Sequence, residues 1–331
     1  MYYDAALFIF KTIIMRWHSV IYLLVFGAIF LFLTVGCEKE DEEMDRKEFW
    51  TNTLLEDISS DSLRSYVEWL GGMGTRFALA ENRRSVAVRI SNNFKRLGYP
   101  ETRIDSFYID RTFHGVEYRL YQYNIEATLP GEEAYDSVCI VGGHYDNILS
   151  SGNPFTVVPG ANDNASGIAA LFEIARVMKL NNYQPRNSIK FVAFGAEELG
   201  LLGSSDYAAN AMQTSRKIML MLNNDMIAYE TETDKTKWKV NIIDYDNSHY
   251  LRKTAEQLCV THTDLGYLND NANYNRSDSY PFFTNGFKPL FFFSEKIDPN
   301  YHSLNDLGTN CNFEYCREVV KLNCAILADK N

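Results

Sequence analysis

Two adjacent carboxylates, Glu197 and Glu198, follow a strand-like apolar run where "FVAFGA" gives way to "EELG". Such a pair is usually solvated at the start of a helix, but polar residues follow apolar runs elsewhere in this chain too. His144 and Asp146 come just after "SVCIVGG", and Asp225 comes directly after "IMLMLNN". Imidazole and carboxylate groups bind divalent metal ions and transfer protons. Their repeated position makes them candidates for one active site.

Two further residues extend this set. His302 lies beyond "PLFFF", and Asp163 lies in the glycine-flanked turn "GANDNASG" ahead of a strongly apolar helical pattern. Each residue alone has an ordinary structural explanation, such as a helix N-cap for an Asp. Several carboxylates in one small space, however, repel one another unless a cation compensates them. The set as a whole therefore predicts a metal site.

The ligand types indicate which kind of metal site this is. Imidazole with carboxylate and no thiolate is typical of a catalytic zinc or a related divalent ion rather than a structural zinc. Five candidate ligands outnumber the three of a single open catalytic zinc, whereas two ions that share a bridging carboxylate use all five. Two ions about 3.5–4 Å apart can hold a hydroxide and polarise a carbonyl. One carboxylate of the glutamate pair can then bind metal while its neighbour takes a proton from water.

Strand-like and helical patterns alternate along the chain and must position these residues. Several apolar runs are continuous, as expected of strands covered on both faces. The alternation predicts a three-layer α/β sandwich with a central mixed, mostly parallel sheet flanked by helices, in which ligands bind beyond the carboxyl ends of the strands. The predicted strands are 116–129, 137–143, 188–195, 218–225, 239–244 and 289–293. The predicted helices are 61–74, 83–99, 166–180, 200–212 and 247–260.

Five blocks occur in order along the chain: "GGHYDN", "GANDNASG", "FVAFGAEELGLLGS", "NNDMI" and "YHSLND". Together they resemble the signature of peptidase family M28, which contains co-catalytic di-zinc aminopeptidases. The segment "RSDSYPFFTNGFKPLFFF" is similar to the part of the family that follows the fourth ligand. The resemblance extends from about residue 70 to the C-terminus. It implies a zinc-dependent exopeptidase fold and two zinc ions per chain.

The resemblance also assigns the metal ligands. It implies that Asp163 bridges the two ions. It further implies that His144 and Glu198 complete the shell of one ion, and that Asp225 and His302 complete the shell of the other.

Further roles follow from the same resemblance. Glu197 corresponds to the general base and acid, which takes a proton from water activated by both ions and donates it to the leaving amine. Asp146 matches a carboxylate that orients a ligand without binding metal itself. Tyr301 matches a position whose hydroxyl supports the tetrahedral oxyanion, with a packed aromatic ring as the alternative. The family often has a cis peptide at the position of Asp163-Asn164.

The first 36 residues have the layout of a signal peptide. An apolar run at 20–33 follows the basic Arg16, and it is shorter than the ~20 residues that a bilayer core requires. A retained transmembrane helix is the alternative. "LTVGC" resembles the lipobox at which bacterial lipoproteins are cleaved and acylated, here on Cys37, although Leu33 lies one position further from the Cys than usual.

Residues 37–48 are expected to form an acidic tether, and 49–331 the M28-like catalytic domain. The acidic run after Cys37 resembles the tag that sends some Gram-negative lipoproteins to the outer face of the outer membrane. This predicts a surface-exposed outer-membrane lipoprotein in a Gram-negative cell envelope. Met15 is an alternative true start, because "MRWHSV" provides a compact basic segment.

Composition excludes several other classes of protein. The 331 residues are 46% hydrophobic and 14% aromatic, which predicts a globular body, and the net charge of −11 disfavours a nucleic-acid partner. HExxH, GxSxG and Walker lysine motifs are all missing from the sequence. The odd number of cysteines after Cys37 leaves any disulfide pairing open. They are Cys139, Cys259, Cys311, Cys316 and Cys324.

Three functions remain in competition, and the leading one is a secreted, lipid-anchored zinc aminopeptidase acting on peptides. Glutaminyl cyclases resemble this family in fold and zinc site, but they tend to carry Trp beside the last ligand, where Tyr301 stands here. A non-catalytic binding domain is expected to have lost metal ligands, whereas every ligand position matches. The loop "GYLNDNANYNRSDSYPFF" is expected to line the pocket that selects the N-terminal residue, as a lid or as plain surface.

Overall fold

The computed structural model describes residues 43–132 and 137–331. The chain divides into two units, Met1–Trp50 and Thr51–Asn331. The expected signal peptide and residues 37–42 of the expected tether lie outside the described residues, and 43–48 of that tether are helical. Within the described ranges, no helix has both the length and the apolar character needed to cross a bilayer.

The second unit is built on one mixed sheet of eight strands, in the order β1-β2-β4-β3-β5-β8-β6-β7. The central neighbours β4, β3, β5 and β8 run parallel, while β2 and β6 run antiparallel to them at the two sides. The strands are β1 (Arg103–Phe113), β2 (Val116–Leu129), β3 (Ser137–His144), β4 (Ser188–Phe194), β5 (Lys217–Asn224), β6 (Lys239–Ile243), β7 (Gly266–Leu268) and β8 (Pro289–Ser294).

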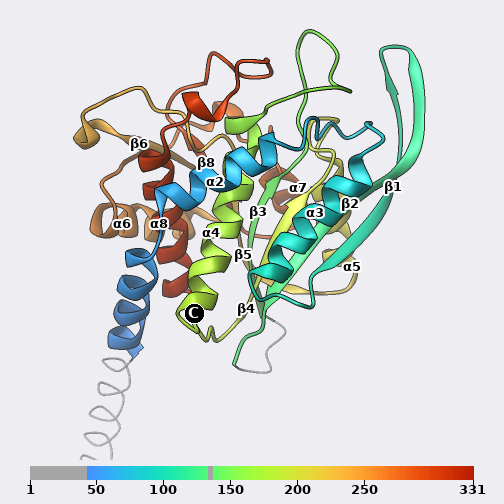
Figure 1. The fold of residues 1–331 in the computed structure, drawn as a ribbon. Helices are drawn as coiled ribbons and strands as arrows, with labels where there is room; N and C mark the ends of the chain where they lie inside the picture. The colour runs from blue at the N-terminus through green and yellow to red at the C-terminus, as the bar shows by residue number, and fades with distance from the viewer. Residues whose placement is uncertain (1–42, 133–136) are drawn as a thin grey trace, which may run out of the picture. The chain divides into compact units, whose positions relative to one another are not determined.

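Helices cover both faces of this sheet, which confirms the predicted three-layer α/β sandwich. Figure 1 shows α2, α3, α4 and α8 on the near face and α5 and α7 on the far face. The helices are α2 (Ser60–Gly71), α3 (Arg83–Arg96), α4 (Ser166–Leu180), α5 (Leu202–Gln213), α6 (His249–His262), α7 (Ser279–Thr284) and α8 (Phe313–Asp329). Residues 43–56 are helical too, and there are short helical turns at η2 (Lys235–Lys237), η3 (Asn271–Asn273) and η4 (Gly308–Asn310). The segment η1 (Ala161–Ala165) is a kinked turn, because Asp163 and Asn164 have non-helical backbone angles.

Helix α4 is the central helix of the near layer and contacts β3, β4, β5, α2 and α8. It is apolar on nearly all sides, which is typical of a fully buried helix. The ring of Phe172 lies 5.3 Å from that of Tyr66 and 4.8 Å from that of Phe94. Because α4 begins directly after η1, its packing against the sheet fixes the turn that carries Asp163.

Two strands and three helices of the described residues were not predicted from the sequence, namely β1, β7, α7, α8 and the helix that includes residues 43–56. Strands β1 and β2 form a long antiparallel hairpin in register from Phe113↔Val116 to Arg103↔Glu126. Its turn residues His114 and Gly115 have φ of 48° and 80°, as a tight hairpin turn with positive φ at both central positions requires.

The cysteines among the described residues are all free. Cys139, Cys259, Cys316 and Cys324 are buried, and Cys311 is partly exposed. Burial raises the pKa of the Cys139 thiol to about 12. The structure therefore shows no disulfide among the described cysteines.

Candidate metal centre

The parallel strands end at one edge of the sheet, and the predicted ligands meet there. His144 is the last residue of β3, and Asp225 follows β5. The Nε2 atom of His144 lies 3.3 Å from Oδ1 of Asp163 and 3.4 Å from Oδ1 of Asp225. All three side chains are buried. They form the first of two clusters that share Asp163.

The second cluster uses the other oxygen of Asp163. The Nε2 atom of His302 lies 3.0 Å from Oδ2 of Asp163 and 3.0 Å from Oε2 of Glu198. Asp163 thus presents one carboxylate oxygen to each imidazole. This is the geometry that a bridging ligand requires, and it agrees with the role expected for Asp163.

The described residues bring together one of the two expected ligand pairs, His144 with Glu198, but not the other. Three groups among them could hold an ion: His144 with Glu197 and Glu198, His144 with Asp163 and Asp225, and Asp163 with Glu198 and His302; none joins Asp225 with His302. The reason is the path of the chain after β8. The backbone N–H of Ser150 donates to the carbonyl of His302 at 2.9 Å, which holds the loop after β8 beside the segment that follows β3.

The side chains of these clusters fit a bound cation. Oε1 of Glu198 and Nε2 of His302 are buried and make no hydrogen bond of good geometry. Burial, together with the charge of Asp163, raises the pKa of Glu198 to about 8. Burial lowers the pKa of His302, but the adjacent carboxylates of Asp163 and Glu198 outweigh it and raise that pKa to about 10. The oxygen and nitrogen donors of this site suit zinc.

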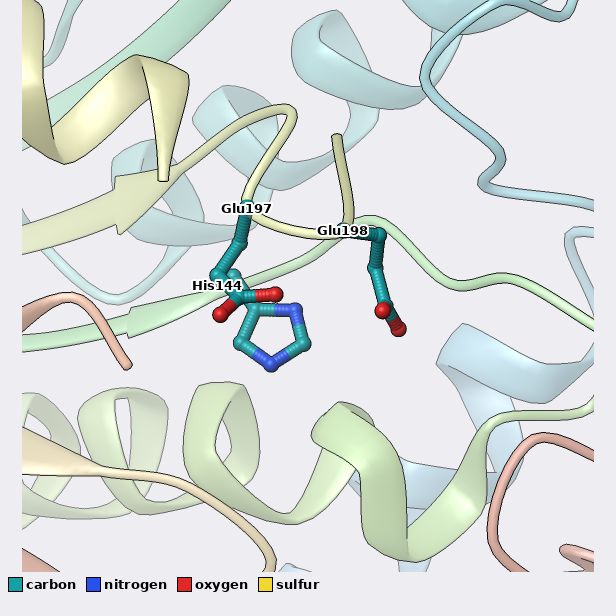
Figure 2. Close-up of side chains that lie close together, drawn as sticks. All are labelled: His144, Glu197 and Glu198. Carbon is teal, nitrogen blue, oxygen red and sulfur yellow. The ribbon is translucent and has the colours of Figure 1, made fainter. Parts of the chain in front are cut away.

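Glu197 and Glu198 come from one tight turn after β4. Ala196 has a φ of 58°, and the N–H groups of Gly200 and Leu201 both donate to the carbonyl of Glu197 at 2.8 Å. Figure 2 shows both carboxylates directed toward the space beside the His144 ring. Burial raises the pKa of Glu197 well above its usual range, and the charge of Glu198 adds to that shift while His144 opposes it.

The side chain of Asp146 holds this turn in place by binding the backbone of the turn. Its fully buried carboxylate accepts the N–H of Glu197 at Oδ1, at 3.0 Å, and the N–H of Glu198 at Oδ2, at 3.2 Å. The Nδ1 atom of His144 is 3.8 Å from Oδ1 of Asp146 but only 3.2 Å from the backbone carbonyl of Asp146. The carboxylate of Asp146 therefore bonds to the backbone of the glutamate pair, while its backbone carbonyl bonds to the imidazole of His144.

The turn that carries Asp163 is held by Asp306. One carboxylate oxygen of Asp306 accepts the N–H of Asn162 at 2.7 Å, and the other accepts the N–H of Asp163 at 3.0 Å. Burial raises the pKa of Asp306 to about 7. The Asp163-Asn164 peptide is cis, as the resemblance implied. Asp306 was not singled out from the sequence, although it ends the "YHSLND" block.

Arg76 and Ser277 are two further supports that the sequence did not reveal. The guanidinium of Arg76 is buried and donates to the carbonyls of Tyr145 at 2.8 Å and Gly160 at 2.7 Å. It thereby ties the segment after β3 to the turn before Asp163. The hydroxyl of Ser277 donates to Oδ2 of Asp225 at 2.7 Å, which leaves Oδ1 of that carboxylate facing His144.

An open cavity lies in front of the clusters. Its empty volume, counted together with the open solvent at its mouth, is about 520 Å³. The ring of Tyr301 lines it and stacks on that of His302, with the centroids 3.6 Å apart. Burial raises the pKa of the Tyr301 hydroxyl, and the carboxylates around it raise it further. The other lining residues are His144, Asp163, Glu197, Glu198, Asp225, Met226, Asn273, Arg276, Phe291, Phe293 and Ile297.

Comparison with known proteins finds a family match and relatives for this chain. Residues 124–327 match the model of peptidase family M28. A leucine aminopeptidase 1 of Ajellomyces capsulatus is 24% identical over 291 residues, which cover 83% of this chain and 72% of the relative.

Solved structures share the fold at low sequence identity. A zinc aminopeptidase from Bacillus subtilis is 17% identical, with a TM-score of 0.67 over 82% of this chain and 95% of its own. A glutaminyl cyclase from Bacteroides thetaiotaomicron is 16% identical, with a TM-score of 0.63 over 83% of this chain and 99% of its own. Both kinds of enzyme therefore share this architecture.

Proposed function

The chain belongs to peptidase family M28, and from this premise we propose that it is a di-zinc aminopeptidase that removes N-terminal residues from peptides. Membership of the family makes it a metal-dependent peptide hydrolase. The observation that carries the finer proposal is the pair of clusters that share Asp163, with Glu197 beside them and an open cavity in front.

In the proposed site, each cluster holds one zinc ion. His144 and Asp225 would hold the first ion, His302 and Glu198 the second, and Asp163 would contribute one oxygen to each. Bound zinc would polarise the scissile carbonyl and make water acidic enough to attack at neutral pH.

Glu197 is the residue proposed to move the proton. It lines the cavity and belongs to neither of the clusters that share Asp163. Its carboxylate would take a proton from the attacking water and donate it to the leaving amine. Asp146 holds the backbone N–H of Glu197, so the base is fixed on a rigid turn.

Tyr301 is proposed to donate a hydrogen bond from its hydroxyl to the oxyanion of the tetrahedral state. Its support is its place on the cavity wall beside His302. Because its pKa is raised, the hydroxyl keeps its proton at neutral pH and can act as a donor.

The cavity also favours cleavage at a free N-terminus. A substrate α-amino group is positively charged and is attracted by the carboxylates at one side of the cavity. Another part of the wall is apolar and suits the side chain of the N-terminal residue, so a leucyl substrate is a suitable first probe. This apolar part consists of Met226, Phe291, Phe293 and Ile297.

Hydrolysis of leucyl-p-nitroanilide tests the proposal, with N-acetyl-leucyl-p-nitroanilide as the matched substrate that lacks a free amine. We expect the zinc-loaded protein to cleave only the free-amine substrate, and a chelator to stop the reaction. Equal cleavage of the acetylated substrate would contradict exopeptidase action.

Glutaminyl cyclase activity is the second candidate, because a cyclase shares the fold over most of both chains. Against it, Tyr301 rather than a Trp stands beside the last ligand. Incubation with a glutaminyl peptide distinguishes the two activities: release of free glutamine supports the aminopeptidase, and pyroglutamyl peptide supports the cyclase. A metal-loaded protein that does neither would support a binding role.

We also propose that the protein is anchored by a lipid on Cys37, as an outer-membrane lipoprotein of a Gram-negative cell. The support is the "LTVGC" segment and the acidic run that follows it. We expect Cys37→Ala to move the protein from the membrane fraction to the soluble fraction. Retention of this variant in the membrane would indicate a different anchor.

A further inference from the structure

Arg276 lines the same cavity as the proposed metal ligands and Glu197. It lies in the segment between β7 and α7, within the loop expected to form the selectivity pocket. The residue is exposed, whereas Ser277 directly after it is fully buried. Among the described residues that line the cavity, Arg276 is the only Arg or Lys, and its side chain is accessible to solvent.

The backbone around Arg276 is held firmly. The hydroxyl of Ser277 accepts a hydrogen bond from the side-chain amide of Asn223 at 2.6 Å and donates to Asp225 at 2.7 Å. The N–H of Arg276 donates to the carbonyl of Asn273 at 3.0 Å. The carbonyl of Tyr274 accepts the hydroxyl of Tyr245 at 2.6 Å. The loop thus fixes the backbone of Arg276. The next residue, Ser277, contacts the proposed metal ligand Asp225.

The guanidinium of Arg276 has no partner among the described residues. Among the described residues, no ion pair or side-chain hydrogen bond joins it to another group. Other cations near buried carboxylates do pair: Arg252 lies 2.9 Å from Asp244, and Lys190 lies 2.6 Å from Glu126. An arginine that faces a cavity with its fork unoccupied is well suited to bind a carboxylate in two parallel hydrogen bonds.

We propose that Arg276 binds a carboxylate of the substrate and so selects among N-terminal residues or peptide lengths. The carboxylate can come from an acidic side chain at the N-terminus or from the α-carboxylate of a short peptide. The apolar wall of Phe291 and Phe293 would contact the methylene groups of a glutamyl side chain. This inference rests on the proposed function, because it concerns the substrate of the same cavity.

Two ratios of kcat/KM test the inference and separate the two sources. One compares α-glutamyl-p-nitroanilide with glutaminyl-p-nitroanilide, which differ only in the charge of the side chain. The other compares the dipeptide Leu-Gly with its C-terminal amide. A charge-assisted hydrogen bond contributes enough for Arg276→Gln to lower the relevant ratio by roughly 10- to 100-fold. Arg276→Lys, which keeps the charge but not the fork, should give an intermediate ratio.

Arg111→Gln is the matched control, since Arg111 is exposed on β1 and donates only to the carbonyl of its neighbour Asp110 at 3.3 Å. It should leave both ratios unchanged. A fall in the first ratio in Arg276→Gln identifies the side-chain carboxylate, and a fall in the second identifies the α-carboxylate. Equal ratios in Arg276→Gln and wild type would overturn the inference.

A binding measurement keeps this test separate from the proposed activity. Calorimetry on the zinc-loaded protein compares the affinities for isoglutamine and glutamine α-amide, which differ in the side-chain carboxylate. A second titration, in the Glu197→Gln background, compares the affinities for Leu-Gly and its C-terminal amide. We expect Arg276→Gln to remove the preference for one carboxylate ligand. If wild type hydrolyses leucyl-p-nitroanilide but shows no carboxylate preference in rate or affinity, the inference fails and the aminopeptidase stands. If no substrate is hydrolysed but the carboxylate preference depends on Arg276, the inference stands and the proposed aminopeptidase activity fails.

Discussion

Replacing Asp146 with Asn removes one of the two hydrogen bonds that hold the glutamate turn. In the native protein, one carboxylate oxygen of Asp146 accepts the N–H of Glu197 at 3.0 Å, and the other accepts the N–H of Glu198 at 3.2 Å. An Asn side chain offers one oxygen and one NH₂ group, so one N–H would face another donor. Asp146 is 0% exposed, and no bulk water can replace the lost acceptor.

The expected loss of stability follows from that single unpaired donor. A buried N–H without a partner costs about 1–3 kcal/mol of unfolding free energy. For a unit of this size that corresponds to a fall of roughly 2–10 °C in the unfolding temperature. A displaced Glu197 should also lower kcat by about 10²-fold, because small errors in the position of a catalytic group have effects of this size.

Thermal unfolding of the chelated protein measures the first effect, and hydrolysis of leucyl-p-nitroanilide by the zinc-loaded protein measures the second. Asp110→Asn is the control, since Asp110 pairs with Arg119 on the exposed hairpin and both side chains are more than half exposed. An Asp146→Asn variant that unfolds within 0.5 °C of wild type, or turns over at its rate, would refute the role given to this carboxylate.

The other predictions concern the base, the core, acid stability and the metal. Glu197→Gln should lower kcat by about 10²–10⁴-fold while bound zinc, measured by atomic absorption, is retained; an active variant would exclude Glu197 as the base. Phe172→Ala should lower the unfolding free energy by about 3–5 kcal/mol in denaturant titration, because its ring is fully buried against Tyr66 and Phe94; a change below 1 kcal/mol would contradict the assigned packing. Burial raises the pKa of Glu126, but Lys190, with Tyr207 and Arg103, outweighs it and lowers that pKa below its usual value. The ionised Glu126 therefore stabilises the fold above its unfolded-state pKa, and this stabilisation is lost as the pH falls through the folded-state pKa. Glu126→Gln should therefore reduce the acid sensitivity of unfolding below about pH 4.3, and an unchanged pH profile would count against the ion pair. Chelation should lower the unfolding temperature of wild type more than that of Asp163→Asn, because only the native clusters bind zinc tightly and metal binding stabilises the folded state.

Much of the site could be predicted because parallel strands deliver their ends to one edge of a sheet. His144 and Asp225 each stand at the end of a continuously apolar run, which marks the strand and its end at once. Asp163 precedes the apolar helix α4, whose burial the sequence pattern also indicates. These positions depend on local sequence, so no tertiary information was needed.

The pairing of the ligands depended on tertiary structure instead. Sequence order does not reveal that the loop after β8 returns to the segment after β3, where Ser150 donates to the carbonyl of His302. Asp306 and Arg76 were missed for a similar reason, because their partners are backbone groups more than 60 residues away in the chain. Helix α8 was missed although Asn312 caps it and its apolar residues have helical spacing.

The most direct test of the shared-carboxylate site is anomalous diffraction at the zinc edge from crystals of the zinc-loaded protein. Two zinc peaks are predicted, each about 2.0–2.2 Å from a different oxygen of Asp163. One should contact His144 and Asp225, and the other His302 and Glu198. A single peak, or two peaks that do not share Asp163, would contradict the di-zinc site on which the proposed function depends.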